Sequence, residues 1–314
     1  MKILVAGSAG FIGHKLCDRL CSGGHAVIGI DCYTADYSVP YKKSITKKLL
    51  SKHKNFKFEK IDILNFSLLR NFFEKNTDFE VVINMTSPAT LRASFDDPHA
   101  YHEINATGTL NLLECSKNLK SIKKFIQASS SSVYGNTKKV PFLEKHSFLK
   151  PINPYGASKI AAETYCQIYS EMYGISTVVF RIFSVYGPGI RPTAGLAKFI
   201  NQIRKNGRID KVYKGVSRDY VYIDDVLDAI CLSLKKRLSF QIINISSGKT
   251  YSTEEIIKLL KKLMSINFQE KYVDGPDVEI KLTRGSTHKA KKILGFAAKT
   301  DIESGLTNLI NNSD

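Results

Sequence analysis

The chain has 314 residues, of which 43% are hydrophobic and 24% charged, a globular balance with room for one large domain or two unequal ones. No apolar run approaches the roughly 20 residues of a membrane span, and the start does not have the form of a signal peptide, so we expect no membrane association and a cytoplasmic location. The formal net charge of +17 raises the question of nucleic acid. Its lysines lie in amphipathic stretches such as KKSITKKLLSKHK, which are typical of solvated helix faces, so we expect no nucleic-acid partner.

The first half of the chain alternates short apolar runs with amphipathic segments. In chain order, strands are predicted at KILVAG, AVIGID, NFKFEKID, VVINM and KKFIQASS, with helices at FIGHKLCDRLCSGG, near FSLLRNFFEK and over residues 98–118. Strands of a parallel sheet are buried on both faces and give such continuous apolar runs. The sequence therefore predicts an α/β fold of Rossmann type, with a doubly wound parallel sheet.

The C-terminal third has a looser pattern. Helices are predicted at LAKFINQIRK, IDDVLDAICLSLKK and TEEIIKLLKKL, and strands at FQIINIS and FQEKYVD. We predict a smaller, interleaved α/β lobe that binds substrate. The expected division assigns residues 1–182, with a returning segment at about 223–250, to the Rossmann domain, and residues 183–222 and 251–314 to the lobe.

The cysteines show no pattern of a metal site or a disulfide framework. None belongs to a CxxC pair or to a Cys/His cluster at zinc-ligand spacing, and the six are Cys17, Cys21, Cys32, Cys115, Cys166 and Cys231. Scattered thiols of this kind are typical of reduced cysteines in a cytosolic protein. We therefore expect no disulfide and no metal.

A glycine-rich segment, AGSAGFIG, follows the first strand and opens the first helix, with the residues Gly7, Gly10, Phe11, Ile12 and Gly13. Glycines there permit a tight turn and let a pyrophosphate approach backbone amides at the positive end of the helix. Asp31 ends the second strand 24 residues after Gly7, where a carboxylate can bond both ribose hydroxyls of an adenosine and repels a 2′-phosphate. The pattern predicts a site for NAD over NADP. Asp62 and Ile63, after the third strand, either flank the adenine or begin a helix as its N-cap.

A tyrosine and a lysine lie one helical turn apart in NPYGASKIAAE. Pro154 precedes a strongly helical run, which places Tyr155 and Lys159 on one face. A free phenol has a pKa of roughly 10 and is a poor base at neutral pH, whereas a neighbouring ammonium stabilises the phenolate. The pair follows the strand end ASSSSVYG, and ligands bind at such ends in doubly wound sheets. It is a candidate for proton transfer, with an exposed helical pair as the alternative.

These features together resemble the extended short-chain dehydrogenase/reductase family of nucleotide-sugar epimerases and dehydratases. The resemblance extends over nearly the whole chain, through GSAGFIG, SPATLRASFDDPHAYHEINATGTLNLLE, ASSSSVYG, YGASK, RIFSVYGPGIRP, RDYVYIDDV and THKAKKILGF. It implies a tightly bound NAD that is regenerated in each cycle. It also implies catalytic roles for Ser130, Tyr155 and Lys159, the serine lying four residues before the tyrosine of VYG.

The resemblance implies further cofactor contacts and a dimer. Met85, Thr86, Asn105 and Ser129 would lie beside NAD. A structural role for Ser129 and a satisfied polar helix position for Asn105 stay open. The helices around residues 98–118 and after Pro154 are similar to those of the family's four-helix dimer interface, so we expect a homodimer.

The serines after the central strand narrow the reaction. Related 4,6-dehydratases carry an Asp-Glu pair where this chain has Ser131 and Ser132, and the 4-decarboxylating enzymes carry a Glu at the position of Ser132. Without an added acid, the resemblance favours simple 4-epimerisation. Tyr155 would take the C4 hydroxyl proton, directly or through Ser130, while hydride leaves C4 for NAD and a 4-keto sugar forms.

Three stretches are similar to UDP-glucuronate 4-epimerases: DCYTADYSVPYKKSI, RASFDDPHAY and RIFSVYGPGIRPTAGLAKF. This similarity implies that Ser184 and Arg191 hold a C6 carboxylate by charge-assisted bonds. Alternatively, Ser184 is a small loop residue, and Arg191 contacts a phosphate or caps the loop. Arg218 is expected to bind the diphosphate, unless it pairs with Asp219 or Asp224.

Further substrate contacts are expected from Ser87, Arg92 and Ser131. The chain also departs from the family, in NMTSPAT at the end of the fourth strand, in Thr193-Ala194 and in Gly285-Ser286. These departures fall beside the expected cofactor and sugar sites. The leading hypothesis is C4 epimerisation of a UDP-sugar, UDP-glucuronate to UDP-galacturonate. The alternatives are an enzyme for a neutral nucleotide sugar, such as UDP-glucose or UDP-N-acetylglucosamine, and a non-catalytic NAD- or RNA-binding relative.

Overall fold

The computed structural model describes residues 1–314 with the exception of 36–37, 89, 138, 147–148, 277–278 and 313–314. The chain divides into two compact units. The first contains Met1–Ser130, Pro154–Arg181 and Ile230–Ile243, and the second contains Ser131–Asn153, Ile182–Ala229 and Asn244–Asp314. The assignment of residue ranges to a cofactor domain and a substrate lobe stays a prediction.

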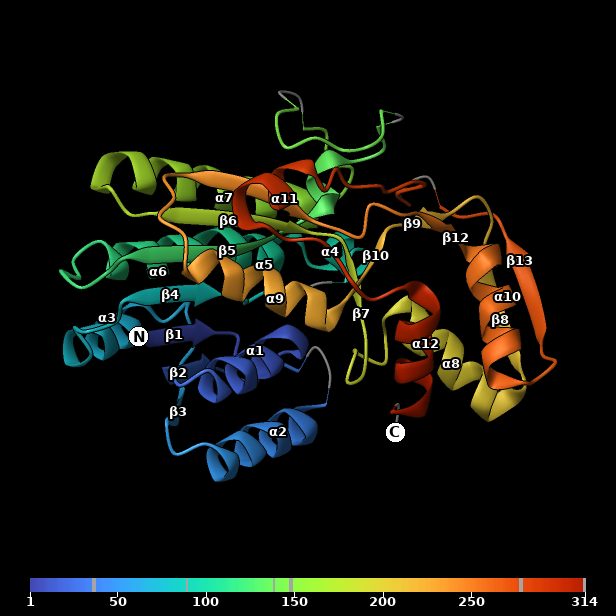
Figure 1. Cartoon of the computed structure of the whole chain (residues 1–314), viewed down its shortest axis with the longest axis horizontal. Helices are drawn as coiled ribbons and strands as arrows, with labels where there is room; N and C mark the ends of the chain where they lie inside the picture. The colour runs from blue at the N-terminus through green and yellow to red at the C-terminus, as the bar shows by residue number, and fades with distance from the viewer. Residues whose placement is uncertain (36–37, 89, 138, 147–148, 277–278, 313–314) are drawn as a thin grey trace. The chain divides into compact units, whose positions relative to one another are not determined.

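A seven-stranded sheet has the order β11-β6-β5-β4-β1-β2-β3 (Figure 1). Its strands are β1 (Lys2–Ala6), β2 (Ala26–Asp31), β3 (Phe56–Lys60), β4 (Val81–Asn84), β5 (Lys124–Ser130), β6 (Thr177–Ile182) and β11 (Gln241–Ile245). The neighbours from β3 to β5 are parallel, and Ile3 of β1 pairs with Val27 on one side and Val81 on the other. The predicted Rossmann-type sheet is confirmed. The strand order reverses between β1 and β4, the place where such sheets bind ligands.

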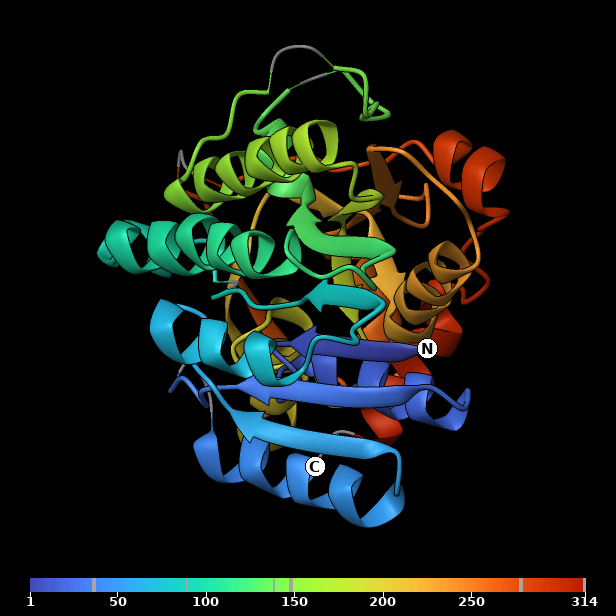
Figure 2. The same ribbon diagram turned by 90° about the vertical axis from the view of Figure 1, so that its left-hand side faces the viewer.

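Helices cover both faces of this sheet in the first unit. They are α1 (Phe11–Ser22), α2 (Val39–Lys52), α3 (Phe66–Lys75), α4 (Ala93–Asp96), α5 (Pro98–His102), α6 (Gly108–Ser116) and α7 (Pro154–Tyr173). Figure 2 shows α3, α6 and α7 stacked along one face and α1 on the other. The core between α3, α6 and the sheet includes the buried rings of Phe72, Phe73, Phe79 and Phe125. None of the helices in the described ranges is long and apolar enough to cross a membrane.

The helix expected over residues 98–118 is interrupted. A π-helical turn, η1 (Glu103–Thr107), separates α5 from α6, and the amide of Gly108 donates to the carbonyl of Glu103 five residues earlier. Gly108 packs against Ile63, so closely that a Cβ at this glycine would lie 2.4 Å from the Ile63 Cδ1 atom. Turns of this kind are frequent at functional sites, and this one contains Asn105.

One lysine of the KKSITKKLLSKHK stretch is not solvated. Lys42 on α2 is 3% exposed, and its Nζ donates to the carbonyl and the hydroxyl of Thr34 at 2.8 and 3.3 Å. Its place on the buried side of an amphipathic helix explains the difference from the expectation, because the long side chain reaches Thr34 in the loop between β2 and α2.

The second unit is built from short strands and helices. The strands β7 (Ser184–Tyr186) and β10 (Tyr220–Tyr222), β9 (Ser217–Arg218) and β12 (Tyr251–Ser252), and β8 (Arg208–Tyr213) and β13 (Gln269–Val273) form three pairs. The helices are α8 (Gly195–Asn206), α10 (Thr253–Met264), α11 (His288–Leu294) and α12 (Ile302–Asn311), with a 3₁₀ turn at η2 (Ser131–Tyr134). Helix α9 (Ile223–Leu234) begins in the second unit and ends in the first.

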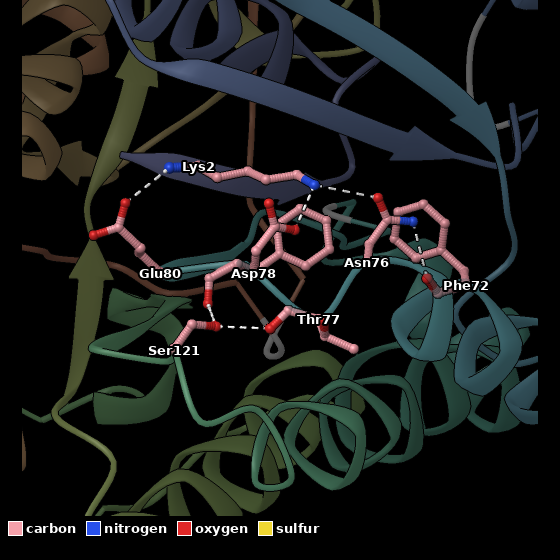
Figure 3. A network of polar contacts seen from close by, with 8 residues as sticks. Lys2, Phe72, Asn76, Thr77, Asp78, Glu80 and Ser121 are labelled. Atoms are coloured by element: carbon pink, nitrogen blue, oxygen red, sulfur yellow. Dashed lines mark hydrogen bonds and ion pairs between the residues drawn. The ribbon is translucent and has the colours of Figure 1, made fainter.

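A polar network lies at the amino-terminal edge of the sheet (Figure 3). The Nζ atom of Lys2 donates to Asp78 at 2.5 Å and to Asn76 at 3.4 Å, while its backbone amide donates to Glu80. Ser121 donates its hydroxyl to the carbonyls of Thr77 and Phe79, a few residues before β4. These bonds tie the loops at this edge to each other without any outside group.

Candidate active site

The glycine turn after β1 is shaped by backbone packing. Gly7 has φ of +78°, and a Cβ there would lie 2.8 Å from the backbone of Met85 and of Thr86. A Cβ on Gly13 would lie 2.0 Å from the carbonyl oxygen of Gly7. The Ncap residue of α1 is Gly10, which supplies no side-chain hydrogen bond, and Phe11 and Ile12 form the first turn. The positive end of α1 is therefore available to an anion.

Asp31 is held in place at the end of β2. One carboxylate oxygen accepts from the amide of Ala9 in the glycine turn at 3.0 Å, and the other accepts from the amide of Tyr33 at 2.7 Å. The carboxylate thus lies beside the glycine turn, as adenosine ribose recognition requires.

Asp62 and Ile63 follow β3 and have different partners. Asp62 accepts the amide of Leu64 at 2.9 Å, whereas the N-cap of α3 is Asn65, so the N-cap alternative for Asp62 is wrong. The buried Ile63 packs on Gly108 and accepts the side chain of Asn111 at its carbonyl. An adenine contact for either residue stays a prediction.

The end of β4 carries the departure NMTSPAT. The amide of Met85 donates to Ala6 of β1, and Thr86 donates both its amide and its hydroxyl to the side chain of Asn84. Asn84 is fully buried and donates to Thr109 and Gln127. Thr86 is therefore fixed by a buried network directly beside Gly7.

Two expected substrate residues follow β4 in the first unit. The hydroxyl of Ser87 donates to the carbonyl of Pro88, and Arg92 is the N-cap of the short helix α4. Both lie in the segment between β4 and α5, which leaves the carboxyl end of the sheet.

Asn105 connects the π-helical turn to α7. Its side chain is 1% exposed and donates to the hydroxyl of Ser158 at 2.9 Å, and that hydroxyl donates to the carbonyl of Tyr155 at 2.8 Å. Within the described residues, the Oδ1 atom of Asn105 has no hydrogen-bond partner. A buried acceptor without a partner is costly, so a ligand or water that donates to it would be favoured.

Tyr155 and Lys159 lie in the first and second turns of α7. Tyr155 is 8% exposed and packs edge-on against Tyr101, with ring centroids 6.1 Å apart. The Nζ atom of Lys159 donates to the carbonyl of Ala128 on β5 at 3.0 Å and lies 5.8 Å from the centroid of the Tyr155 ring. Burial lowers the pKa of Lys159 to about 7, while the charge of Glu163 opposes that shift. The pair is buried, which excludes the alternative of an exposed helical pair.

The two serines at the end of β5 differ in their surroundings. Ser129 donates its hydroxyl to Glu163 of α7, and Glu163 also accepts a bidentate pair of bonds from Arg181 of β6. Ser130 is the last residue of the strand and is 9% exposed. Because alternate residues of a strand face opposite sides, Ser130 is directed away from the Glu163 side.

The remaining expected residues belong to the second unit. Ser131 begins the 3₁₀ turn η2 and is 8% exposed. Ser184 begins β7, and its amide donates to the carbonyl of Asp219 at 3.1 Å. Arg191 lies in the turn before α8, where its carbonyl accepts from the amide of Ala194 at 2.9 Å.

Arg218 pairs with Glu279 at 2.6 Å, and both side chains are largely buried. The carboxylate of its neighbour Asp219 accepts the amides of Ser247, Gly248 and Gly285. Burial raises the pKa of Asp219 to about 6, and these bonds oppose the shift. Asp219 therefore organises the loops around β9 and β10.

The residues of the first unit fit a dinucleotide. The glycine turn leaves no room for a Cβ, α1 begins without a side-chain cap, Asp31 is fixed beside the turn, and Asn105 presents a buried acceptor. No group of three or more metal-ligating side chains occurs in the part of the chain that the structure describes. All six cysteines are free thiols.

Two buried residues of the site were missed from the sequence, Glu163 and Arg181. The signal for Glu163 was its spacing of four residues from Lys159 in YGASKIAAE. Nothing local indicated Arg181, which lies in an apolar strand, TVVFRI.

Comparisons with known proteins identify the family of the chain. The model of the NAD dependent epimerase/dehydratase family matches residues 3–246. A UDP-glucuronate 4-epimerase of Thermodesulfobacterium geofontis is 37% identical over 310 residues, which cover 98% of this chain and 94% of that protein.

Solved structures are similar over the whole length. The UDP-glucuronic acid 4-epimerase of Bacillus cereus, in complex with UDP-glucuronic acid and NAD, superposes with a TM-score of 0.92 at 30% identity and covers 99% of this chain and 98% of its own. The UDP-glucose 4-epimerase of Thermotoga maritima, with UDP-glucose, gives 0.90 at 29% identity and the same coverage. Because the family model matches most of the chain and these relatives cover almost all of it, the protein belongs to the NAD dependent epimerase/dehydratase family.

Proposed function

We propose that the chain is an NAD-dependent UDP-glucuronate 4-epimerase that interconverts UDP-glucuronate and UDP-galacturonate through a 4-keto intermediate. The observation that carries the proposal is the buried Tyr155–Lys159 pair against the end of β5, where the sequence has only hydroxyl side chains, from Ser129 to Ser132. Such a site can move one proton and has no added acid for dehydration.

The residues of the first unit have separate tasks in this reaction. When bound, NAD supplies the acceptor for the hydride of C4. Tyr155 as phenolate accepts the proton of the C4 hydroxyl, directly or through Ser130, and the C4–O bond becomes a carbonyl. The charge of Lys159 stabilises the phenolate. The hydride then returns to the opposite face of C4, and Tyr155 gives the proton back to the oxygen of the inverted sugar.

The residues of the second unit are proposed to hold the substrate. A 4-keto uronate is a β-keto acid and is prone to lose carbon dioxide, so an epimerase must grip its carboxylate in a geometry that disfavours cleavage. Ser184 and Arg191 are suited to this grip by their hydroxyl and guanidinium groups. Arg218 is proposed to bind the diphosphate, for which it would exchange or share its bond to Glu279.

The test is incubation of the purified protein with UDP-glucuronate, UDP-glucose and UDP-N-acetylglucosamine, followed by chromatography of the products. We expect UDP-galacturonate from the first and slower or no turnover of the others. In Arg191→Ala, the ratio of decarboxylated to epimerised product should rise. Turnover confined to UDP-glucose would favour the second candidate, a neutral-sugar 4-epimerase, which the likeness to the Thermotoga maritima structure supports.

A homodimer through a four-helix bundle and a cytoplasmic location belong to the same proposal. Apolar side chains at the surface of the first unit support the dimer: Phe95 of α4 is 45% exposed, and Ile168 and Met172 of α7 are 45% and 71% exposed. Light scattering should give twice the mass of one chain, and Met172→Glu should halve it. Free thiols suit a reducing compartment, which cell fractionation would test.

A further inference from the structure

A buried cluster of charge continues the face of α7 that carries Tyr155 and Lys159. Glu163 is 4% exposed and Arg181 is 2% exposed. The Nη2 atom of Arg181 lies 2.7 Å from one carboxylate oxygen of Glu163, and its Nε atom lies 3.0 Å from the other. The hydroxyl of Ser129 donates to the same carboxylate. The proposed reaction uses none of these bonds.

The arrangement keeps apart two charges that lie on the same face of the helix. A carboxylate four residues after a lysine is within reach of it, although the reverse order gives the better ion pair. In the described structure, however, no ion pair or hydrogen bond joins Lys159 to Glu163. The oxygens of Glu163 are taken by Arg181 and Ser129, on β6 and β5, and the ammonium of Lys159 instead lies against the Tyr155 ring and the carbonyl of Ala128.

We infer that Glu163, clamped by Arg181 and Ser129, is a positioning residue for proton transfer. Its charge keeps the buried amine of Lys159 protonated, and the clamp keeps the carboxylate from drawing that ammonium away from Tyr155. The inference rests on the proposed function of the Tyr155–Lys159 pair.

Electrostatics gives the size and the sign of the effect. Side chains at positions i and i+4 lie about 6 Å apart, and at an effective dielectric constant of about 20 a unit charge at that distance corresponds to about two pH units. Burial lowers the pKa of Lys159 to about 7, and Glu163 opposes the shift. Among the described residues, other titratable groups around the pair are Cys166 on α7, Tyr101 on α5 and Arg181 on β6.

Removal of one charge should therefore move the pH profile in a direction set by its sign. In Glu163→Gln the site is more positive, so the acid limb of kcat/KM moves down, by up to about two pH units. The maximum of kcat/KM falls about tenfold. Glu163 is nearer to Lys159 than to Tyr155 along the helix, so its loss makes the lysine, rather than the phenol, give up the proton, and less of the active phenolate forms. In Arg181→Gln the acid limb moves up. In the double variant Glu163→Gln/Arg181→Met, which removes both charges, the acid limb should lie between those of the two single variants. This variant leaves neither Glu163 nor Arg181 as a buried unpaired charge, so it tests the proposal even if a single variant misfolds.

A second readout does not depend on the sugar. The near-ultraviolet absorbance of the phenolate, taken as the difference between each protein and the same protein carrying Tyr155→Phe, reports the ionisation of Tyr155. In Glu163→Gln the lysine loses its proton first, so most of the phenolate should form at a higher pH than in the wild type, without the help of the ammonium. If the titration moves in this way while no UDP-glucuronate is converted, the proposed function fails and the inference stands.

The matched control is Glu114→Gln. The carboxylate of Glu114 on α6 accepts from Lys117 and from Tyr169. Tyr169 lies on α7, about two turns beyond Glu163. Its removal should leave the profile and the titration unchanged. The inference is overturned if both cluster variants only scale the activity, with limbs and titrations that superimpose on those of the wild type.

Discussion

Two buried lysines stand at opposite ends of strand β5. Lys124 begins the strand and is 4% exposed, and Lys159 of α7 reaches the carbonyl of Ala128 near its end and is 1% exposed. Burial lowers the pKa of both, to about 8 and about 7. Lys124 donates to two carbonyls, those of Ser233 and Lys236 at the end of α9, whereas Lys159 donates to one and lies against a tyrosine ring. A shifted pKa alone thus does not separate a structural lysine from a functional one, but its partners do.

The same contrast separates the two edges of the sheet. At the amino-terminal edge, Lys2, Asp78 and Ser121 satisfy their neighbours within the protein (Figure 3). At the carboxyl-terminal edge, the Oδ1 atom of Asn105 and the Oγ atom of the buried Ser8 have no hydrogen-bond partner among the described residues. The Oγ atom of Ser176, just before β6 at the amino-terminal edge, is also without a partner among the described residues, so unmet bonding capacity indicates the ligand edge only together with the glycine turn and the fixed carboxylate of Asp31.

The largest effect is expected for Lys159→Met. The phenolate of Tyr155 loses its cation, so kcat/KM should fall by about 10³-fold, within the range for loss of acid–base catalysis. The substitution also removes the desolvation cost of the buried amine, which offsets the lost hydrogen bond. The thermal midpoint should therefore stay within a few degrees of that of the wild type. A loss of folding in this variant, measured by circular dichroism, would contradict the assignment of the two lysines.

Gly7→Ala tests whether the glycine turn at the carboxyl-terminal edge binds NAD, without a change in any charged side chain. The alanine Cβ would lie 2.8 Å from the backbone of Met85 and Thr86, at a φ of +78°. We expect about 1–3 kcal/mol of destabilisation from the strained backbone. The affinity for NAD, measured by calorimetry, should fall by about 100-fold, since displacement of the turn moves its amides. Gly24→Ala, with φ of +80° and open space around it, is the control for backbone strain alone.

Lys124→Met should have the opposite outcome to Lys159→Met. It removes the lysine donor from the carbonyls of Ser233 and Lys236, of which the first keeps the amide of Lys236, and this should cost about 1–3 kcal/mol of unfolding free energy. The turnover per folded molecule should be unchanged. Urea unfolding and activity measured on the same sample would show whether stability and catalysis separate.

The pH dependence of stability sharpens this test. The pKa of Lys124 is about 8 in the folded state, below its ordinary value of 10.5. Between these values the unfolded state holds a proton that the folded state has lost, so the contribution of Lys124 to stability rises with pH over this window. Below pH 8 both states are protonated, and the burial cost is present in full. The difference in unfolding free energy between the wild type and Lys124→Met should therefore grow from about pH 7.5 to about pH 9.5. Urea unfolding at each pH measures this difference.

The smallest effect is expected for Asp78→Asn in the network of Figure 3. Asp78 pairs with Lys2, but its side chain is 68% exposed. Exposed ion pairs contribute about 0.5 kcal/mol or less, and they are screened by salt. Neither turnover nor NAD affinity should change. A large loss of activity here would mean that the two edges are coupled.

The sequence by itself determined the α/β sheet and much of the proposed site. Strand and helix periodicity is local, so the alternation from KILVAG to KKFIQASS was sufficient to predict the parallel sheet. The glycine turn and the Tyr155–Lys159 spacing are likewise local patterns, and the structure places Gly7 beside Met85 and Lys159 beside the Tyr155 ring.

Only the tertiary structure decided which charges are buried and with what partners. Lys124 meets Ser233 across 109 positions, and Arg181 of β6 meets Glu163 of α7 across 18, because strand order and helix packing bring those segments together. The π-helical turn at Asn105 is likewise followed by a long-range contact, that of Gly108 with Ile63. A charge in an amphipathic stretch is expected in solvent unless a partner from elsewhere in the chain satisfies it, and periodicity carries no information about that partner.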